Sequence, residues 1–252
     1  MNLINGKKIS EEILEELKKE IQKRSIKPCL GVILVGDDKA SHIYVNKKEE
    51  SAERIGIKIK KYVLDKDVSE KEILETINIL NLDNQVNGIL IQLPLPQHIS
   101  SETIIKAINP EKDVDGFLSE SKFDSPFILA IERALNEAGG IENKKVVALV
   151  NSEIFGQALK LRFNIEYQTQ INDLSQFDVI ITALGQSEVI KESMIKSGVI
   201  LIDGGISKKN GKIVGDVDRE SVRNKVSWLS PVPGGLGPMT VSFLLKNVVL
   251  AV

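Results

Sequence analysis

The sequence predicts an α/β fold made of two α/β domains in series, and three observations support this prediction. Apolar runs typical of buried parallel strands alternate with helical patterns from Cys29 to about residue 108. A second alternating series begins at Lys144, after a loop without helical or strand periodicity. A final helix, residues 238–252, is apolar nearly all round, so we expect it to be buried and to return to the first domain. The predicted domains are residues 1–122, completed by 238–252, and residues 123–237.

The first domain is predicted to open with an amphipathic helix, residues 9–21, whose apolar side chains recur at helical spacing. The run CLGVILVGDD is continuously apolar and ends in turn residues, which is typical of a strand buried on both faces. A charged helix follows from about Ala40, and Gly56 is its stop signal. The order then repeats as a strand (IKIKKYVL), a helix (69–82), a strand (NGILIQLP) and a helix (100–108).

The second domain is expected beyond the loop NPEKDVDGF, whose Pro, Asp and Gly residues interrupt regular structure. A connecting helix, residues 126–138, leads to a strand, KKVVALV. The later elements are a helix (153–163), a strand (DVIITALG), a helix (191–197), a strand (GVILIDGG) and two shorter strands (KIVGDV and KVSWLS). Strands that alternate with helices predict a mostly parallel sheet.

Composition narrows the possible partners and compartments. The 33 Lys and Arg residues nearly balance 35 Asp and Glu residues, so we expect neither a nucleic-acid partner nor a polybasic membrane surface. The single cysteine, Cys29, cannot form an intramolecular disulfide or a Cys-rich zinc site, and no metal site is expected. No segment reaches the roughly 20 apolar residues of a membrane span, and MNLINGKKIS lacks the pattern of a signal peptide, so we expect a cytoplasmic protein.

Tyr44 and Lys48 are the first candidate chemical group. Their i, i+4 spacing puts both side chains on one face of the helix that follows the first buried strand. A lysine held beside a phenol and partly desolvated can lose its proton near neutral pH and act as a general base. The alternative is a solvated helix face with ion pairs, since charged residues surround both positions.

Two further candidates follow predicted strands at the edge where parallel sheets bind ligands. Gln92 ends a strand in IQLPLPQH and could hydrogen-bond a neighbouring side chain or a ligand. Asp113 and Asp115 lie in the loop EKDVDGF, where a carboxylate could accept two hydrogen bonds from a flat, amidine-like heterocycle. The alternatives are a rigid turn at the first segment and an Asx-turn at the second.

The segment SPVPGGLGPMT combines glycines with a proline at a predicted helix start. Gly234, Gly235 and Gly237 permit close backbone approach, and Pro238 leaves free N–H groups that could cradle an anion. The alternative is a turn before a helix. The second domain has no GxGxxG pattern, and Gly156 is the one glycine in the segment LVNSEIFGQA after its first strand, so a dinucleotide site there is inferred from topology.

Together these segments resemble one family, the bifunctional methylenetetrahydrofolate dehydrogenase/methenyltetrahydrofolate cyclohydrolases. The similar segments are VGDDKASHIYVNKK, IQLPLPQHI, INPEKDVDGF, VILIDGGI, GDVD and PVPGGLGPMT, in this order. The resemblance implies a folate-binding catalytic domain followed by a Rossmann-like dinucleotide-binding domain. It also implies interconversion of 5,10-methylene-, 5,10-methenyl- and 10-formyltetrahydrofolate, with NADP or NAD as cofactor, in a homodimer.

The same resemblance implies roles for individual residues. Lys48 would activate water and move protons, Gln92 would hold Lys48, Tyr44 would orient the substrate, and Asp115 would bind the pterin ring; these four form the catalytic group. Further substrate contacts would come from the loop residues Pro233, Gly234 and Gly235. The cofactor would be bound by Ser152, Gly156, Gly185, Gly205, Ile206 and Thr240.

The middle of the chain departs from the family pattern and keeps two other hypotheses open. Where the family has GRSxxVGxP, this chain has VNSEIFGQA, with Asn151 in place of the arginine. The first alternative is therefore a cyclohydrolase that has lost its dinucleotide. The second is a folate-binding dimer partner without catalysis.

Overall fold

The computed structural model describes the backbone of residues 1–252 and every side chain except that of Ala40. The chain forms two compact units, each built around one parallel sheet. The three-stranded unit comprises Ser10–Pro126 and Val241–Val252, and the six-stranded unit comprises Met1–Ile9 and Phe127–Thr240. Helices α1 (Gly6–Arg24) and α8 (Leu236–Leu250) each contribute residues to both units.

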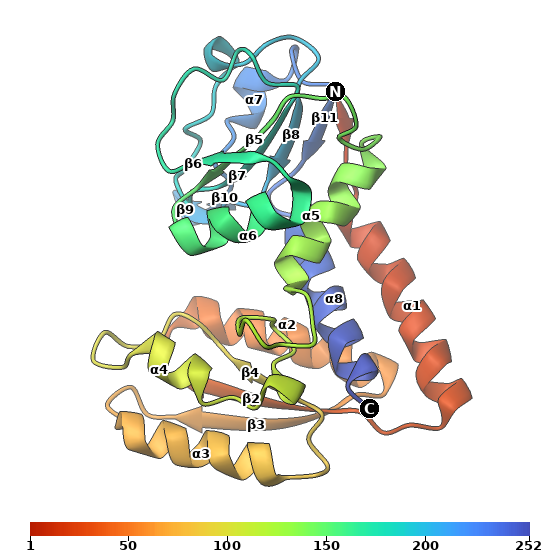
Figure 1. The fold of residues 1–252 in the computed structure, drawn as a ribbon, viewed down its shortest axis with the longest axis vertical. Coiled ribbons are helices and arrows are strands. Elements are labelled where there is room, and N and C mark those ends of the chain that lie inside the picture. The colour runs from red at the N-terminus through yellow and green to blue at the C-terminus, as the bar shows by residue number, and fades with distance from the viewer. The chain divides into compact units, whose positions relative to one another are not determined.

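The sheet of the three-stranded unit has the order β3-β2-β4, with all strands parallel (Figure 1). Its central strand, β2 (Cys29–Val35), is buried along its whole length between β3 (Lys58–Leu64) and β4 (Gly88–Ile91). Alternate β2 side chains enter two different cores, because successive strand residues point to opposite faces. One core includes residues of α1, α2 and α8, and the other includes residues of α3 (Glu70–Leu82) and α4 (Ser101–Lys106).

Helix α2 (Lys39–Ile55) follows the carboxyl end of β2 and has defined signals at both ends. The Asp38 carboxylate caps its start by accepting a hydrogen bond from the backbone N–H of Ser41 at 2.7 Å. Its end is Gly56, whose φ of 93° is the left-handed conformation that favours glycine. Helix α3 begins with a capping box between Ser69 and Glu72. These local signals explain why the helix positions were predictable from the sequence.

The sheet of the six-stranded unit has the order β1-β11-β8-β7-β5-β6 and is parallel throughout (Figure 1). The central strands are short and buried, as expected where helices cover both faces of a parallel sheet. Their bounds are β1 (Asn2–Leu3), β5 (Val146–Val150), β6 (Glu166–Gln168), β7 (Val179–Ala183), β8 (Ile200–Asp203) and β11 (Trp228–Ser230).

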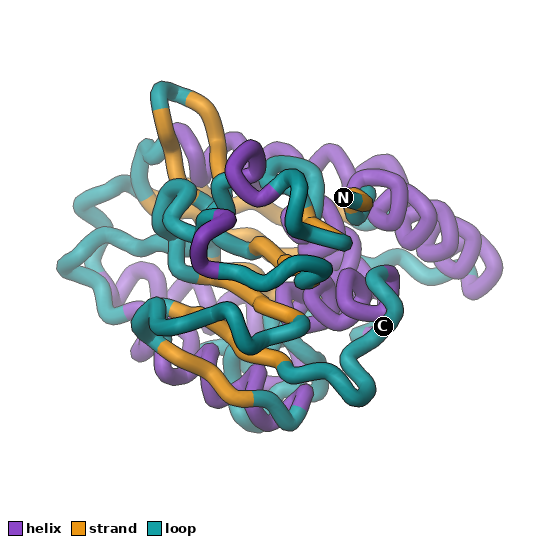
Figure 2. Tube along the Cα trace, turned by 90° about the horizontal axis from the view of Figure 1, so that it is seen from above, coloured by secondary structure: helices purple, strands orange, loops and turns teal.

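The connections of this unit include helices α5 (Pro126–Glu137), α6 (Glu153–Phe163) and α7 (Arg219–Val222). A small antiparallel hairpin, β9 (Ser207–Lys209) and β10 (Lys212–Val214), follows β8. Figure 2 shows this hairpin as two strand segments joined by a tight turn.

The prediction of a mostly parallel α/β fold is confirmed, but two local expectations fail. The helix predicted over residues 191–197 is wrong, because only Glu192–Met194 form a short 3₁₀ turn between extended neighbours. Met1–Ile9 do not join the first domain as predicted, because β1 pairs with β11 and extends the six-stranded sheet. The C-terminal helix does return, since Val241–Val252 belong to the three-stranded unit.

Candidate active site

Lys48 lies on α2 and is buried, with 8% of its surface exposed. Its Nζ donates a hydrogen bond to Oε1 of Gln92 at 3.1 Å. Gln92 directly follows β4, where its backbone N–H donates to the Ile33 carbonyl and continues the sheet pattern. Its side-chain Nε2 donates to the Leu93 carbonyl at 2.6 Å, which turns the amide oxygen toward the lysine. The sheet thus fixes the acceptor and the helix fixes the amine.

Tyr44 precedes Lys48 by one turn of α2, as the spacing predicts. The Lys48 Nζ lies 5.4 Å from the centre of the Tyr44 ring, within range of a cation–π contact. Burial raises the pKa of the Tyr44 phenol, and the negative charge of Asp115 raises it further. The phenol therefore stays protonated near neutral pH and can donate a hydrogen bond.

Asp113 and Asp115, which the sequence treats as a pair, have different surroundings. Asp113 is fully buried and accepts a hydrogen bond on Oδ2 from the Leu118 backbone at 2.8 Å, so it organises the loop. Asp115 is half-buried and interacts electrostatically with Lys48 and Tyr44. Among the described residues, none donates a hydrogen bond to the Asp115 carboxylate, which leaves both oxygens available to a ligand.

Burial and charge act in opposite directions on this cluster. Burial lowers the pKa of the Lys48 amine below its ordinary 10.5, and the nearby Asp115 partly counters that effect. Burial raises the pKa of Asp115 to about 6, Lys48 lowers it, and Asp113 raises it again. A lysine with a lowered pKa gives up its proton more readily than a solvated lysine, so the cluster can carry out general acid–base chemistry.

The carboxyl edge of the six-stranded sheet offers a different kind of site. The chain places β6 on one side of β5 and then β7 on the other, which creates the switch point where open α/β sheets bind ligands. Asn151 follows β5, and its Nδ2 donates to the Leu184 carbonyl beyond β7 at 3.1 Å. Ser152 caps α6 by accepting from the Phe155 N–H at 3.4 Å, so a helix N-terminus lies at this edge.

Two buried carboxylates bind the loops at this edge to one another. Asp203, at the end of β8, accepts hydrogen bonds from the backbone N–H groups of Gly205, Asp216 and Val217 at 3.0, 3.1 and 3.0 Å. Burial raises the pKa of Asp203 to about 7, although these hydrogen bonds act to lower it, and the charge of Asp216 adds to the rise. The carboxylate fixes the start of the hairpin segment relative to β8.

Asp216 makes the corresponding connection to β7. It accepts hydrogen bonds from the Thr182 hydroxyl at 2.6 Å and from the backbone N–H groups of Leu184 and Gln186 at 2.7 and 2.8 Å. A Cβ on Gly205 would lie 2.1 Å from this carboxylate, so only glycine fits there. Gly185, with φ of 69°, lies between the two anchored N–H groups. Loop shape here depends on backbone contacts rather than on exposed side chains.

The remaining predicted cofactor residues occupy varied positions in this unit. Gly156 lies inside α6, where a Cβ would approach the Tyr167 ring to 2.3 Å. Because glycine has no Cβ, α6 can pack closely against β6 at this position. Ile206 is 55% exposed and follows the β8 end, while the Thr240 hydroxyl donates to the Leu236 carbonyl within α8.

The segment Pro233–Gly235 follows β11 at the same edge. A Cβ on Gly6 would lie 1.8 Å from the Gly235 carbonyl oxygen, so this loop packs directly on the start of α1. Gly234 has φ of 107° and needs glycine for that reason. The helix N-terminus, the glycine-lined loops and the switch point together fit an extended dinucleotide.

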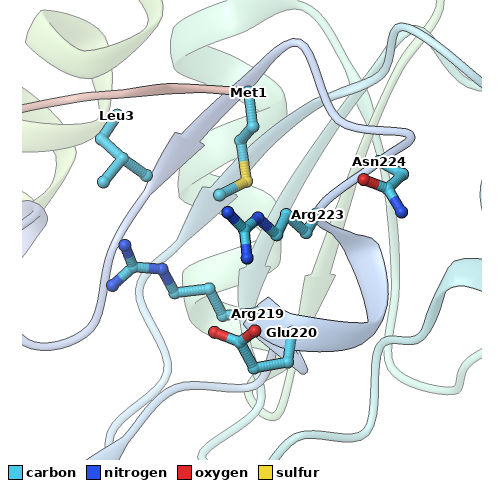
Figure 3. A pocket seen from close by; sticks show the side chains of 6 residues that line it. All are labelled: Met1, Leu3, Arg219, Glu220, Arg223 and Asn224. Atoms are coloured by element: carbon cyan, nitrogen blue, oxygen red, sulfur yellow. The ribbon is translucent and has the colours of Figure 1, made fainter.

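A surface hollow of about 520 Å³ in this unit is lined by Met1, Leu3, Arg219, Glu220, Arg223 and Asn224 (Figure 3). It borders the residues that precede β1 and β11, which is the amino edge of the parallel sheet. Ligands of open α/β sheets bind at the opposite, carboxyl edge, so we do not assign the cofactor to it.

Sequence reasoning missed residues that hold the site from a distance. Asn247 on α8 is buried, and its Nδ2 donates to the carbonyls of Val114 and Asp124 at 2.9 and 3.0 Å, which fixes the loop that carries Asp115. Lys112 ties the same loop to the end of α3 through the carbonyls of Leu80, Asn81 and Asp83. The sequence did offer one signal for Asn247, which is an amide side chain within a largely apolar helix.

Among the described residues, no three or more His, Cys, Asp or Glu side chains gather as metal ligands would. No helix in the described chain combines the length and apolar character that crossing a membrane requires.

The fold and these sites define an α/β enzyme with one acid–base unit and one dinucleotide-binding unit. Residues 4–115 match the family described as tetrahydrofolate dehydrogenase/cyclohydrolase, catalytic domain, and residues 129–252 match its NAD(P)-binding domain. The chain therefore belongs to the tetrahydrofolate dehydrogenase/cyclohydrolase family. Its activity is that of a methylenetetrahydrofolate dehydrogenase and methenyltetrahydrofolate cyclohydrolase, with NAD(P) as the cofactor of the second unit.

Individual relatives are similar over nearly their whole length. The bifunctional protein FolD of Aquifex aeolicus is 43% identical over 270 residues, covering 97% of this chain and 93% of the relative. The crystal structure of FolD from Campylobacter jejuni has a TM-score of 0.92 at 38% identity and covers 100% of this chain and 98% of that one. A Trypanosoma brucei FolD complexed with NADP and an inhibitor has a TM-score of 0.91 at 28% identity, with 99% and 96% coverage. Nothing in these comparisons favours either of the two alternative hypotheses.

Proposed function

We propose that Lys48 is the group that moves protons in the cyclohydrolase reaction. The observation that carries this proposal is the buried Lys48 amine, hydrogen-bonded to the Gln92 amide at 3.1 Å and adjacent to Tyr44. Solvated surface lysines have no such desolvation and keep their charge. An amine that is partly neutral can accept a proton from water, which an ammonium cannot do.

The hydrolysis then proceeds in two proton-coupled steps. The neutral Lys48 amine takes a proton from water as the water oxygen bonds to the methenyl carbon. The tetrahedral adduct collapses when the bond between that carbon and N5 breaks, and the Lys48 ammonium returns its proton to N5. The remaining hydroxyl loses its proton to solvent and becomes the formyl oxygen on N10. Gln92 keeps the amine in place and is a positioning residue.

Tyr44 and Asp115 bind and orient the substrate in this proposal. The protonated Tyr44 phenol lies beside the amine and can donate to the substrate. Asp115 offers two carboxylate oxygens, which suit paired N–H donors of a pterin ring. The half-buried setting of Asp115 strengthens such hydrogen bonds by limiting competition from water.

The dehydrogenase step uses the carboxyl edge of the six-stranded sheet. NAD(P), when bound, accepts a hydride at C4 of its nicotinamide. We assign its binding to Ser152, Gly156, Gly185, Gly205, Ile206 and Thr240, and further substrate contact to Pro233, Gly234 and Gly235. The Asp203 and Asp216 carboxylates support this assignment, because they hold the glycine loops in one shape.

Replacement of Lys48 by methionine tests the proposal. Lys48→Met keeps the length and apolar stem, so we expect a drop of about a hundredfold to ten-thousandfold in methenyltetrahydrofolate hydrolysis with folate binding largely retained. Lys47→Met is the matched control, because Lys47 is the exposed neighbour on the same helix. Hydrolysis that persists within a few-fold of the wild-type rate in Lys48→Met would contradict the proposal.

We also propose that the chain acts as a homodimer. The six-stranded sheet ends at β6, and Leu161 on the adjoining α6 is 77% exposed, so a second copy could cover this edge. Light scattering should give twice the 27.8 kDa chain mass, and Leu161→Glu should shift the molecule toward monomer. A monomeric wild type would overturn this assignment.

The proposed compartment is the cytoplasm. Cys29 is buried and free, so the fold uses no disulfide and needs no oxidising environment. Cell fractionation against a secreted marker tests this assignment, and recovery in the secreted fraction would contradict it.

A further inference from the structure

The six-stranded unit contains the features that distinguish two forms of the dinucleotide, NAD and NADP, which differ only at the 2′ position of the adenosine ribose. In dinucleotide-binding sheets that ribose lies near the carboxyl end of the strand that follows the first helix. Here the first strand is β5, the helix is α6, and the following strand is β6 (Glu166–Gln168). The relevant surroundings are therefore the β6 end and the first turn of α6.

This edge lacks the cations that a 2′-phosphate needs. Neither residues 146–159 nor residues 163–190 contain a lysine or arginine, so the loops after β5 and β6 and the first seven residues after β7 are without one. The charged residues in the first turn of α6 and in the segments that follow β6 and β7 at this edge are acidic: Glu153, Asp173 and Glu188. A phosphate of charge near −2 would be repelled there rather than paired.

The nearest lysines and arginines of this unit lie elsewhere. Lys160 and Arg162 belong to the last turn of α6, roughly 10 Å or more along the helix from its start, and Arg162 pairs with Glu132 at 2.7 Å. Lys209 is in the hairpin after β8 and pairs with Glu188. The end of β8, from which this hairpin begins, is three strands and roughly 14 Å across the sheet from the end of β6.

Glu153 has the position and the support to recognise a hydroxyl instead. It is the first residue of α6, and its Oε2 accepts a hydrogen bond from the Tyr167 hydroxyl at 2.7 Å. Tyr167 is on β6, and its ring packs where a Cβ on Gly156 would lie, so the phenol is held between helix and strand. Among the described residues, none donates to Oε1 of Glu153, which leaves that oxygen for a ribose hydroxyl.

We propose that this unit selects NAD over NADP, with Glu153, positioned by Tyr167, accepting a hydrogen bond from the adenosine ribose 2′-hydroxyl. A hydroxyl donates to a carboxylate, whereas a 2′-phosphate brings like charge to the same oxygen. The proposal rests on the assignment of the dinucleotide to the carboxyl edge of this unit, and it is independent of the role of Lys48.

Binding titrations followed by nicotinamide fluorescence test the proposal without catalysis. The full chain is titrated with NADH and with NADPH at low salt, and we expect NADH to bind at least about tenfold tighter. In Glu153→Gln, which keeps an acceptor for Tyr167 but loses the charge, the ratio should fall below about threefold, mainly through tighter NADPH binding. Glu220→Gln removes an exposed charge at the amino edge and should leave the ratio unchanged.

Three results would overturn the proposal. The first is NADPH binding as tightly as NADH in the wild type, and the second is an unchanged ratio in Glu153→Gln. The third is binding of neither nucleotide. The titration is repeated on Lys48→Met, where the same tenfold ratio is expected even if Lys48 has no part in hydrolysis, so the two proposals can fail separately.

Discussion

The carboxyl edges of the two sheets are built from different parts of the chain. In the three-stranded unit, side chains form the site: the Lys48 amine contacts the Gln92 amide and the Tyr44 ring, and the Asp115 carboxylate acts on Lys48 and Tyr44 by its charge. In the six-stranded unit, side-chain carboxylates bind backbone N–H groups, and the glycine loops form the surface. The difference teaches that proton transfer requires tuned side chains, whereas holding a cofactor requires a fixed backbone.

The largest expected effect comes from moving the backbone at the carboxyl edge of the six-stranded sheet. Gly205→Ala would place a Cβ 2.1 Å from the Asp216 carboxylate, so the loop must shift. We expect dinucleotide affinity to fall about a hundredfold, while methenyltetrahydrofolate hydrolysis stays within about twofold. Fluorescence titration and hydrolysis assays measure the two effects, with Ile213→Ala, at an exposed position of the hairpin, as the control. Lost hydrolysis with intact dinucleotide binding would reverse the assignment of the two edges.

The buried carboxylate Asp203 should contribute more to stability than any exposed acid of its unit. Both carboxylate oxygens of Asp203 accept hydrogen bonds from backbone N–H groups. Asp203→Asn would replace one of these oxygens by an NH₂ group, which cannot accept, so at least one backbone N–H would lose its partner. We expect a loss of about 1–3 kcal/mol in the free energy of unfolding, measured by chemical denaturation. Glu220→Gln, at the surface, should change it by less than about 0.5 kcal/mol. Equal effects of the two substitutions would show that the loops do not depend on Asp203.

Substitutions of Gln92 sharpen the description of the first edge. The Gln92 carbonyl accepts from the Lys48 ammonium, so Gln92→Leu removes support for the charged form and lowers the pKa of Lys48 further. The acid limb of the hydrolysis pH profile should move to lower pH, with a maximal rate reduced about tenfold. Gln92→Glu adds a negative charge and should move the limb to higher pH. If neither substitution moves the acid limb of the pH profile, Gln92 does not influence the pKa of Lys48.

A further expected effect is a pH dependence of stability. The folded pKa of Asp203, about 7, lies above its ordinary 3.8, so the folded protein holds this proton more tightly than the unfolded chain does. Stability from this group is present below about pH 4 and is lost as the pH rises toward 7. Asp115, with a pKa of about 6, acts in the same direction. Asp203→Asn should flatten this slope between pH 4 and 7 in denaturation curves, and an unchanged slope would contradict the raised pKa.

Much of the fold was predictable because local signals agree with tertiary structure. The α6 bounds, residues 153–163, match the prediction, and Gly56 ends α2 as expected. Strand β6 was missed because a three-residue polar strand has no clear period. Residues 191–197 were expected to be helical as one element of the alternating series, but so short a segment forms no stable helix.

The site was predictable only in part. The spacing of Tyr44 and Lys48 follows from helix geometry, but their meeting with Gln92 and Asp115 depends on the order of strands in the sheet. Asp203 and Asp216 carry no local pattern, because their partners are backbone groups distant in the sequence. The sequence also does not indicate which carbonyl groups accept hydrogen bonds from Asn247.

The central claim is that burial lowers the pKa of the Lys48 amine, and lysine ¹⁵Nζ NMR titration tests it most directly. The spectrum is recorded on the full chain from pH 6 to 11, with the Lys48 resonance assigned by its absence in Lys48→Arg. We predict a Lys48 midpoint below the ordinary lysine value of 10.5, because burial disfavours the charged ammonium. A Lys48 midpoint at or above 10.5 would contradict the account.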